Sequence, residues 1–600
     1  MPQSPADIQT SQATTAGRDL FASGRKRAQR WVQADDEDTQ LRTARAFCTA
    51  LLDTYWSSIQ PDRDPLPLPP VVERYETASL TKPAQKLACR LGEAAARFGP
   101  LEAGYQIGRV YTATLPSAYQ SQHGIYYTPP ALTQRLLDLA ARSGVDWAAD
   151  TVLDPACGGG AFLAPVALRM AEARGTNDPA ETLQHIADHL HGYEIDPFGA
   201  WTSQVLLEAA LLDVCRAAGT RLPAVVEVTD SLDRGGENER FDCVIGNPPY
   251  GRVTLSSERR EQFDRSLYGH ANVYGLFTDL ALRLAAPDGR VAFVTPTGFL
   301  AGQYFKALRG LLGRTAPPAH IDFLSVREGV FADVLQETLL AVYDKTRQTA
   351  GSSPAQVHVV SPTAPDTLDV EEAGTFRLPN DPTQPWVIPR RAEQGLLVEG
   401  MHEMPCRIQD YGYEISTGPL VWNRHKERLR TESTRETHPL IWAEAVTADG
   451  DFRFRSEKPN HEPYFDPGDD QDWLVVRQPC VLVQRTTAKE QHRRLIAAEL
   501  PGPFVEKHDG VVVENHLNMV YPAADPSVSV RALAALLNSE IVDQAFRCIS
   551  GSVAVSAYEL EALPLPSIET MQAVEELLQQ GVPAAQIESL LRDAYLSSHG

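Results

Sequence analysis

The sequence predicts an α/β protein with a doubly wound, mostly parallel sheet, preceded by a helical region and followed by a mixed α+β region. Between residues 124 and 343, short β-branched runs alternate with helical stretches, which is typical of a mostly parallel sheet wrapped by helices. Before residue 120, apolar residues recur every three to four positions and indicate helices. After residue 386, strand-like pieces containing Trp precede helical stretches.

The elements follow in order along the chain. Region 1–120 is predicted to hold helices over 41–56 and 83–99, separated by a Pro-rich break. The sheet domain, 121–345, is predicted to contain strands at 151–154, 191–196, 224–230, 241–247, 289–296 and 339–344. Residues 346–385 read as a connector around one strand, 357–361. The last domain, 386–600, is predicted to end in one helix over 530–547 and another over 571–595.

Length and composition exclude several classes of protein. A chain of 600 residues is too long for one hydrophobic core and predicts three or four domain-sized units. No apolar run is long enough to span a membrane, and no secretory leader is readable, so we expect a cytoplasmic protein. The eight cysteines contain no CxxC pair and are expected to be reduced and mostly buried, and the fifteen His lack metal-ligand spacing, so no metal site is expected.

The formal net charge of −23 would repel a polyanion unless basic residues gather on one face. Taken alone, the charge therefore argues against nucleic acid as a partner.

A glycine-rich turn follows the first predicted strand of the sheet domain. The strand ends at Asp154, Gly158 to Gly160 form the turn, and a helix follows. Such a turn lets a ligand approach the backbone, and the helix N-terminus favours a negative group. The run lacks the third glycine of GxGxxG and the GK[ST] of a Walker A loop. By itself it is equally compatible with a structural tight turn.

Two acidic residues stand at the ends of the next two strands. Glu194 is placed where a carboxylate can accept both ribose hydroxyls of a nucleoside, and Asp230 where it could accept from an adenine amino group. Either acid alone is more often a strand-end or capping residue. Three such positions at successive strand ends favour a nucleoside pocket.

The tetrapeptide Asn247-Pro248-Pro249-Tyr250 follows the fourth strand. In a chain of this length it arises by chance about once in several hundred sequences. An exocyclic amine of adenine is a poor nucleophile, and the Asn247 side-chain oxygen and the Pro248 carbonyl could accept hydrogen bonds from its protons while the prolines hold the loop. Tyr250 offers a face for stacking on a base flipped out of a duplex. The structural alternative is a Pro-rich turn with a buried Tyr.

The segments DPACGGGAF, GYEID, TDSL and GNPPYG, in this order, resemble class I S-adenosylmethionine-dependent methyltransferases, which have a Rossmann-like sheet. NPPY is similar to the branch that methylates DNA adenine N6, and GIYYTPPALTQRLLDLA ahead of the glycine turn resembles the gamma-type motif order. In that segment Thr128 is a plausible N-cap and Pro129 a plausible first helical residue. The resemblance implies S-adenosyl-L-methionine as cofactor. The cofactor contacts expected on these grounds are Tyr127, Thr128, Asp154, Ala156, Gly158, Gly160, Glu194, Ile195, Asp230, Ser231, Asn247, Pro249 and Phe277.

Two phenylalanines are assigned through the resemblance alone. Phe277 stands where the NxYGxF segment of the family lines the cofactor pocket, and Phe331 where a VFP-type segment stacks on the flipped adenine. Ala332 stands here where the family often has Pro. The resemblance covers residues 124 to 343 and extends to the C-terminal segment 536–566. The catalytic residues expected are Asn247, Pro248, Pro249, Tyr250 and Phe331.

Binding to DNA requires local cations. Arg252, Arg259, Arg260 and Arg265 flank the tetrapeptide. A second group lies in the C-terminal domain, namely Arg424, Lys426, Arg428, Arg430, Arg485, Lys489, Arg493 and Arg494. Of all these, Arg252, Arg424, Lys426, Arg428, Arg485 and Lys489 are the DNA contacts that we predict. Acidic residues lie between them, so for any single one a solvated salt bridge is the more ordinary role.

These features together predict a site-specific DNA adenine-N6 methyltransferase of a restriction or phage-defence system, with double-stranded DNA as partner and residues 386–600 as target-recognition domain. No nuclease motif of the PD…(D/E)xK kind is present, so cutting would belong to a separate subunit, which the helical N-terminal region could dock. The alternatives are methylation of RNA or of protein glutamine, and a non-catalytic DNA-binding subunit that senses the cofactor.

Overall fold

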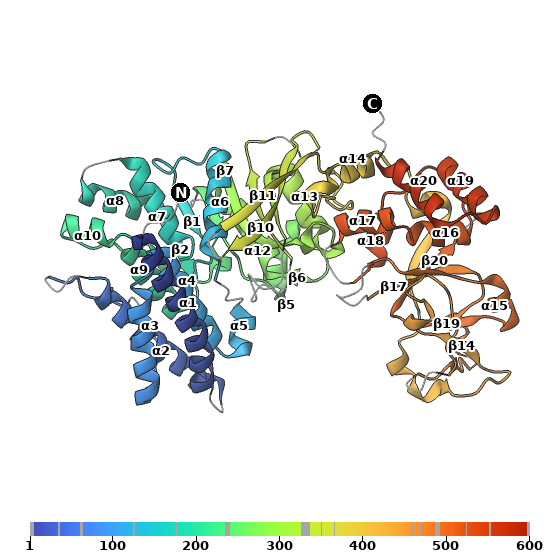
Figure 1. Cartoon of the computed structure of the whole chain (residues 1–600), viewed down its shortest axis with the longest axis horizontal. Helices are drawn as coiled ribbons and strands as arrows, with labels where there is room; N and C mark the ends of the chain where they lie inside the picture. Colours follow the sequence, from blue (N-terminus) through green and yellow to red (C-terminus); the bar gives the residue numbers. More distant parts are fainter. Residues whose placement is uncertain are drawn as a thin grey trace. The chain divides into compact units, whose positions relative to one another are not determined.

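The computed structural model describes residues 5–596 except 34–35, 61–63, 72, 124–126, 176–177, 235–239, 326–336, 348, 350, 365–366, 458–460, 469, 487–492, 524 and 551–553. The chain divides into two compact units (Figure 1). Unit 1 comprises 1–296 and 307–371, and unit 2 comprises 297–306 and 372–600.

Unit 1 begins with a bundle of helices: α1 (Pro5–Val32), α2 (Glu37–Ser58), α3 (Lys82–Ala95), α4 (Pro100–Thr114) and α5 (Ser117–His123). Asp36 caps α2 by accepting from the Thr39 amide, and Thr81 caps α3 through the Ala84 amide. The apolar faces of these helices form one core with Phe198, Trp201 and other residues of α9 (Pro197–Ala210). Because the bundle shares this core with the sheet domain, the expected helical region is part of unit 1, and two units form where three or four were predicted.

A nine-stranded sheet forms the centre of unit 1. Its strands are β1 (Val152–Asp154), β2 (Leu190–Glu194), β3 (Val226–Val228), β4 (Phe241–Gly246), β7 (Ala285–Pro296), β8 (Pro318–Leu324), β9 (Thr338–Asp344), β10 (Ala355–Ala364) and β11 (Thr367–Phe376). Their order is β11-β10-β8-β9-β7-β4-β1-β2-β3. Pairing is parallel from β3 through β7, and β9 runs antiparallel to β7 and β8. The architecture is therefore mixed α/β with a large central sheet, and all six predicted strands are present.

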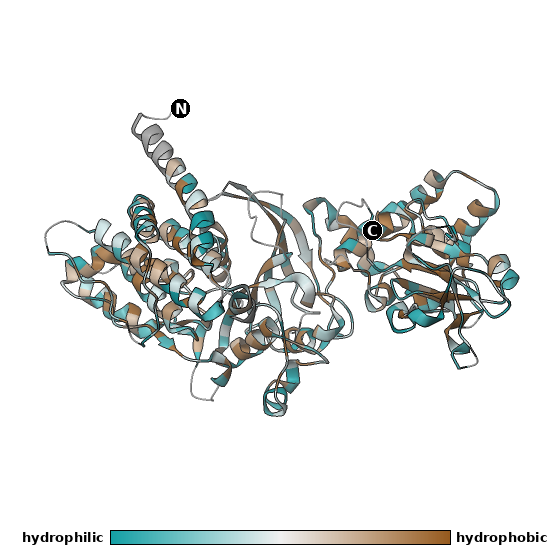
Figure 2. Ribbon diagram, turned by 90° about the horizontal axis from the view of Figure 1, so that it is seen from below, coloured by the Kyte–Doolittle hydropathy of each residue, from teal (hydrophilic) through white to brown (hydrophobic). Residues whose placement is uncertain are grey.

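Helices connect and cover these strands: α6 (Pro130–Arg142), α7 (Leu163–Arg174), α8 (Pro179–His189), α9, α10 (Leu212–Ala218), α11 (Ser257–Gln262), α12 (Val273–Leu284) and α13 (Lys306–Thr315). A short antiparallel pair, β5 (Arg252–Val253) with β6 (Ala271–Asn272), follows the NPPY loop. The strands β1, β2 and β4 are buried between apolar helix faces. Along the helices in Figure 2, hydrophobic and hydrophilic residues alternate, as expected where one face of a helix packs on a core.

The predicted connector differs from the structure. Its strand 357–361 belongs to β10, which pairs with β8 in parallel, and β11 continues the sheet beyond it. Alternating buried residues such as Val357 and Val359 explain why this segment joins the sheet although it is rich in Ser, Thr and Pro.

Unit 2 contains two sheets with the orders β12-β20-β17-β18 and β13-β15-β14-β19-β16. Their strands are β12 (Tyr413–Thr417), β13 (Leu429–Arg430), β14 (His438–Ile441), β15 (Tyr464–Phe465), β16 (Val475–Val476), β17 (Cys480–Gln484), β18 (Ala497–Leu500), β19 (Val511–Val513) and β20 (Leu517–Pro522). The helices are α14 (Gly395–Glu403), α15 (Gly502–Lys507), α16 (Val530–Leu537), α17 (Glu540–Ile549), α18 (Ala557–Glu561), α19 (Ile568–Gln579) and α20 (Ala584–Leu596).

Both predicted C-terminal helices are divided in two. Asn538 is the C-cap of α16, and Ser539 caps α17 by accepting from the Val542 amide at 3.4 Å. Gly581, with φ of 67°, separates α19 from α20. The apolar periodicity continues across both breaks, so periodicity alone did not locate the capping serine or the left-handed glycine as the ends of helices.

All eight cysteines are free, and all but Cys89 are buried. In the described part of the chain, no helix has the length and apolar character needed to cross a bilayer. Among the same residues, no group of three or more His, Cys, Asp or Glu is arranged to hold a metal ion.

Candidate active site

A cavity of about 260 Å³ opens at the carboxyl ends of β1, β2, β3 and β4. All but one of the residues predicted to contact a cofactor line it: Tyr127, Thr128, Asp154, Ala156, Gly158, Glu194, Ile195, Asp230, Ser231, Asn247, Pro249 and Phe277. The exception, Gly160, packs against α9, where an added Cβ would lie 3.2 Å from the Ser203 Cα. The fold thus brings together segments that are up to 150 residues apart, counting from Tyr127 to Phe277.

The glycine turn closes one side of this cavity. Gly158 and Gly160 have φ of 54° and 78°, a region that L side chains rarely adopt. The Gly158 amide donates to Glu194 Oε2 at 2.9 Å, and the Gly158 carbonyl accepts from Ser203 Oγ at 2.8 Å. The turn is therefore tied to β2 and α9 through its main chain.

Asp154 is 1% exposed at the end of β1. Its Oδ1 accepts from the Ala156 amide at 3.0 Å, and a Cβ on Gly246 would lie 2.6 Å from the same oxygen. Burial raises the pKa of Asp154 to about 8. A side chain at position 246 would therefore collide with this carboxyl group, which occupies the space next to the NPPY loop.

Glu194 is fixed by two backbone amides. Oε2 accepts from Gly158 and Oε1 from the Asp196 amide, each at 2.9 Å. Burial raises the pKa of Glu194 to about 7 despite these bonds. A carboxylate held in this way has a fixed orientation and keeps lone pairs for two further donors.

Asp230 follows β3 and has an unexpected neighbour. Its Oδ2 lies 3.1 Å from Arg259 Nη2, and the same nitrogen lies 2.6 Å from Asp233 Oδ1. Arg259, considered above as a DNA contact, is thus engaged at the rim of the cavity because α11 places it over these acids. Ser231 donates to the Pro155 carbonyl, and Ile195 is 51% exposed at the cavity.

The NPPY loop begins where β4 ends. Asn247 Nδ2 donates to Thr128 Oγ1 at 3.1 Å, and Asn247 Oδ1 accepts from Tyr250 Oη at 2.6 Å. The Tyr250 hydroxyl oxygen also lies 3.2 Å from the Val294 carbonyl oxygen, a second acceptor for its one proton, and the ring meets Tyr274 edge to face. Because Thr128 has taken the donor side of the amide, the acceptor Oδ1 is directed toward Tyr250.

The helix after Thr128 starts one residue later than predicted. Pro129 is the N-cap and Pro130 the first residue of α6, and no side chain caps this helix. The Thr128 hydroxyl accepts from Asn247, so the predicted N-cap is wrong in its helix role, although Thr128 does line the cavity.

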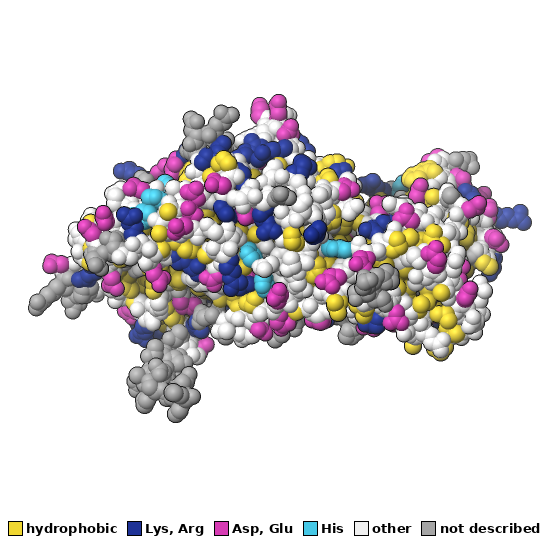
Figure 3. All heavy atoms as spheres, turned by 90° about the horizontal axis from the view of Figure 1, so that it is seen from above, with side chains coloured by type: hydrophobic (Ala, Val, Ile, Leu, Met, Phe, Trp, Pro, Cys, Tyr) yellow, Lys and Arg dark blue, Asp and Glu magenta, His cyan; other side chains and the backbone are white. Residues whose placement is uncertain are grey.

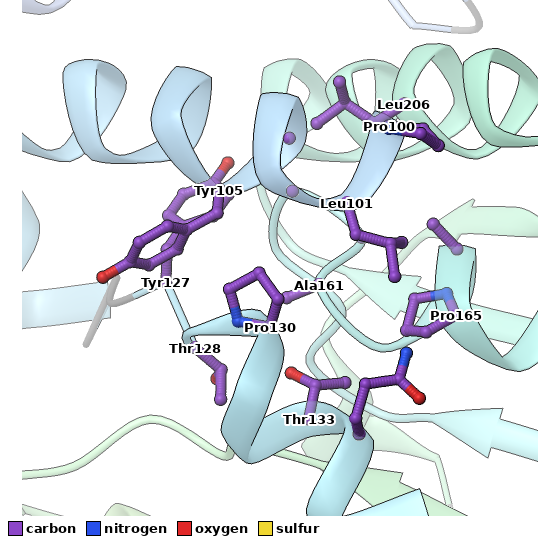
Figure 4. Close-up of a pocket in the computed structure, with 15 residues that line it drawn as sticks. Pro100, Leu101, Tyr105, Tyr127, Thr128, Pro130, Thr133, Ala161, Pro165 and Leu206 are labelled. Atoms are coloured by element: carbon purple, nitrogen blue, oxygen red, sulfur yellow. The ribbon is translucent and has the colours of Figure 1, made fainter. Parts of the chain in front are cut away.

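Tyr127 fills a slot between two glycines. A Cβ on Gly159 would lie 1.8 Å from Tyr127 Oη, and one on Gly108 would lie 1.9 Å from Tyr127 Cε1. Tyr127 and Thr128 also line a second, smaller pocket of about 30 Å³, beside Tyr105 of α4 and Pro130 of α6 (Figure 4). Tyr127 therefore separates two pockets, and its position depends on both α4 and the glycine turn.

Substituting Gly108 by alanine is expected to weaken ligand binding in the cavity, although Gly to Ala in a helix ordinarily stabilises by about 1 kcal/mol. The added Cβ would displace the Tyr127 ring, and overpacking of this kind costs about 1–3 kcal/mol. Gly104→Ala, one turn earlier in α4, is the matched control because its Cβ would meet only Leu206 at 3.4 Å. Thermal unfolding and titration with S-adenosylhomocysteine measure both effects. Equal results for the two variants would contradict the prediction.

The two predicted phenylalanines differ in outcome. Phe277 is 7% exposed on α12 and lines the cavity. Phe331 lies outside the described residues, so its assignment stays a prediction.

The structure adds residues that the motifs did not indicate. Tyr111 of α4 lines the cavity and donates to Asp196 Oδ2 at 2.9 Å, and Arg45 of α2 lies 2.8 Å from Asp196 Oδ1. Asp196 stands in the GYEID segment, but nothing in the sequence of the helical region connects Arg45 or Tyr111 to it.

Two of the six predicted DNA contacts bind other groups within unit 2. Arg428 pairs with Asp470 at 2.9 Å, and Arg485 donates to the Asn515 carbonyl. Arg252 and Arg424 are exposed, and neither forms an ion pair within the described residues.

Lys426 is exposed and lies 5.4 Å from the Trp422 ring centroid, and Lys489 is outside the described residues. On the face in Figure 3, basic side chains lie in small groups among acidic ones.

Three comparisons bear on this site. Residues 204–331, which include the NPPY loop, match the family model described as Eco57I restriction-modification methylase. The chain is similar to restriction-modification methylases over this stretch. It is 27% identical over 382 residues to the Type II methyltransferase M.BsuBI of Bacillus subtilis, covering 61% of the chain and 73% of that relative. It is 25% identical over 355 residues to the Type II methyltransferase M.PstI of Providencia stuartii, covering 57% and 68%.

The chain also resembles a solved structure. The Type IIL restriction-modification enzyme MmeI, solved in complex with DNA, aligns with a TM-score of 0.50 and 13% identity, over 99% of the chain and 95% of that protein. At this identity the likeness shows the fold alone. The sequence matched by the family model contains Asp230, Asn247, Tyr250 and Phe277, and Thr128 and the glycine turn lie before it.

Proposed function

We propose that the protein is a site-specific DNA methyltransferase that methylates the N6 amino group of an adenine flipped out of double-stranded DNA, in a restriction-modification or phage-defence system. The observation that carries the proposal is the Asn247 amide. It stands at the edge of the cavity with its donor side held by Thr128 and its acceptor oxygen bound to a hydroxyl donor. An adenine amine is a donor of the same kind.

S-Adenosylmethionine would supply an electrophilic methyl group as cofactor. The residues present suit it, because the cavity contains a carboxylate fixed by two amides, Glu194, for the ribose hydroxyls. Ile195 and Phe277 offer apolar surface for the adenine ring. The ammonium group of the cofactor would favour the ionised form of the Asp154 carboxyl group and pair with it.

The chain's own residues would orient the target amine. Asn247 Oδ1 and the Pro248 carbonyl accept hydrogen bonds from its two N–H groups, which leaves the nitrogen lone pair directed at the methyl group. Since the Tyr250 hydroxyl takes Asn247 Oδ1 in this structure, that hydroxyl must turn away when the base enters. The ring of Tyr250 then stacks on the base, with Phe331 expected on its other face.

DNA binding is proposed to require both units. The names of the relatives and of MmeI in complex with DNA support a DNA substrate, and Arg252 and Arg424 are exposed cations available for phosphates. Residues 386–600 would act as the target-recognition domain, and a separate restriction subunit would supply cutting.

Methyl transfer from labelled S-adenosylmethionine to mixed-sequence duplex DNA, followed by digestion to nucleosides, tests the proposal. Label in N6-methyl-deoxyadenosine is expected. Label in RNA or protein instead, with duplex DNA unlabelled, would favour the alternative acceptors. Cofactor binding without turnover on any DNA would favour a non-catalytic subunit.

A further inference from the structure

The N-terminal helical bundle forms part of the cavity wall. α9 packs beside α2 and α4 of the bundle, and the three share one hydrophobic core (Figure 1). Tyr111 projects from α4 to line the cavity itself. The bundle therefore contacts the candidate active site directly as well as through its core.

The contact centres on the carboxylate of Asp196, which is 4% exposed as a residue and is the N-cap of α9. Asp196 Oδ1 accepts from Arg45 Nη2 at 2.8 Å and from the Phe198 amide at 3.1 Å. Asp196 Oδ2 accepts from Tyr111 Oη at 2.9 Å. A buried carboxylate needs such partners, and here two of the three come from the bundle.

Asp196 in turn sets the position of Glu194. The Asp196 amide donates to Glu194 Oε1, and the Gly158 amide donates to Oε2. A Cβ on Gly199, in the first turn of α9, would lie 3.2 Å from Glu194 Cγ, so the Glu194 side chain packs directly on the start of that helix. Movement of the start of α9 would displace the Glu194 carboxylate.

We propose that Arg45 and Tyr111 are positioning residues that act through Asp196 to hold Glu194 in the orientation that binds the ribose of the cofactor. The helical bundle thereby determines cofactor affinity. The inference rests on the proposed function, since it takes an adenosine-containing ligand as the occupant. Hydrogen bonds depend steeply on direction, so a small displacement of Glu194 would weaken both ribose contacts together.

Two variants remove the positioning contacts with little other change. Tyr111→Phe removes one hydroxyl, and Arg45→Met removes the charge but keeps much of the apolar stem. Arg42→Met and Tyr55→Phe are matched controls in α2. Arg42 pairs with Asp38 and Glu76 on the surface, and Tyr55 is buried in the same bundle core.

Calorimetric titration with S-adenosylhomocysteine measures the affinity without turnover. We expect Tyr111→Phe to weaken binding about 3- to 10-fold and Arg45→Met about 10- to 100-fold, with the controls within about twofold of the unmodified chain. Tyr111→Phe is expected to leave the unfolding temperature nearly unchanged. Should Arg45→Met fail to fold, because it leaves Asp196 without its cation, the Tyr111→Phe series decides alone.

A double-mutant cycle separates positioning from a merely structural role. In a Glu194→Gln background, Tyr111→Phe and Arg45→Met are expected to lose most of their effect, to within about twofold, because the group they position has been changed. Two outcomes would overturn this inference and leave the proposed function standing. One is that the variants have effects of the same size in both backgrounds, and the other is that their affinities equal that of the unmodified chain. Failure of the unmodified chain to bind S-adenosylhomocysteine would overturn the proposed function and this inference with it.

Discussion

Replacing Asn247 by alanine is expected to lower the rate of methyl transfer by about 100- to 1000-fold, the range found when one preorganised polar contact to a reacting group is removed. The variant removes the Oδ1 acceptor and the bond to Thr128. Single-turnover transfer to duplex DNA measures the rate. Titration with S-adenosylhomocysteine is the internal control and should change by less than about tenfold. Transfer at the unmodified rate would exclude the role given to this loop.

Thr128 offers a finer test of the same arrangement. Thr128→Val removes the hydroxyl that accepts from Asn247 Nδ2 but keeps the shape of the side chain, so the amide could turn over and present its donor side to the substrate. A loss of about 3- to 10-fold in the rate follows from one neutral hydrogen bond. Thr128→Ser retains the hydroxyl and should retain most of the rate. If both variants were equally impaired, packing would be the cause.

The second large effect is a dependence of cofactor affinity on pH through Glu194. Without ligand, burial raises the pKa of this carboxyl group to about 7, so it is mostly protonated below that pH. Ribose hydroxyls bind best to the ionised form, and binding therefore expels a proton. The Kd for S-adenosylhomocysteine is expected to rise as pH falls below about 7, approaching tenfold per pH unit, and to level off above it.

The matched variant is Glu194→Gln, which cannot ionise. It should bind about 100-fold more weakly at pH 8, since two hydrogen bonds to a charged group are weakened. The affinity of this variant for S-adenosylhomocysteine should also change less between pH 5.5 and 7.5 than the affinity of the unmodified chain does. Asp154, whose pKa burial raises to about 8, would account for a remaining dependence near that pH. A flat profile for the unmodified chain would contradict the assignment of Glu194.

The raised pKa of Glu194 has the opposite effect on the stability of the cofactor-free protein, since the stability falls as pH rises. Because the folded pKa of Glu194 lies above the ordinary value of 4.5, the folded state binds more protons than the unfolded state between about pH 4.5 and 7. The contribution of this group to the free energy of unfolding therefore falls as pH rises through that window. Over this pH range the affinity for S-adenosylhomocysteine is expected to rise while this contribution to the free energy of unfolding falls. A loss of affinity at low pH therefore cannot be attributed to general destabilisation of the protein.

The sequence by itself was sufficient for six strands of the large sheet, and for the cavity at the ends of four of them. β-Branched runs located β1, β2, β3, β4, β7 and β9, and polar residues at the ends of four of them meet around one cavity. The prediction succeeds because parallel strands place their carboxyl ends at one edge of the sheet. Residues that directly follow such strands in the sequence therefore lie close together in space. Twelve of the thirteen predicted cofactor contacts line that cavity for this reason.

Only the tertiary structure decided the contacts that join distant segments. Gly108 and Gly159 make a slot for Tyr127, Arg259 pairs with Asp230, and Arg45 reaches Asp196 across 151 residues. No local pattern marks these residues, because their role depends on which helix faces pack together. The same limit explains the late start of α6 at Pro130, where the hydroxyl of Thr128 binds a side chain 119 residues away instead of capping its own helix.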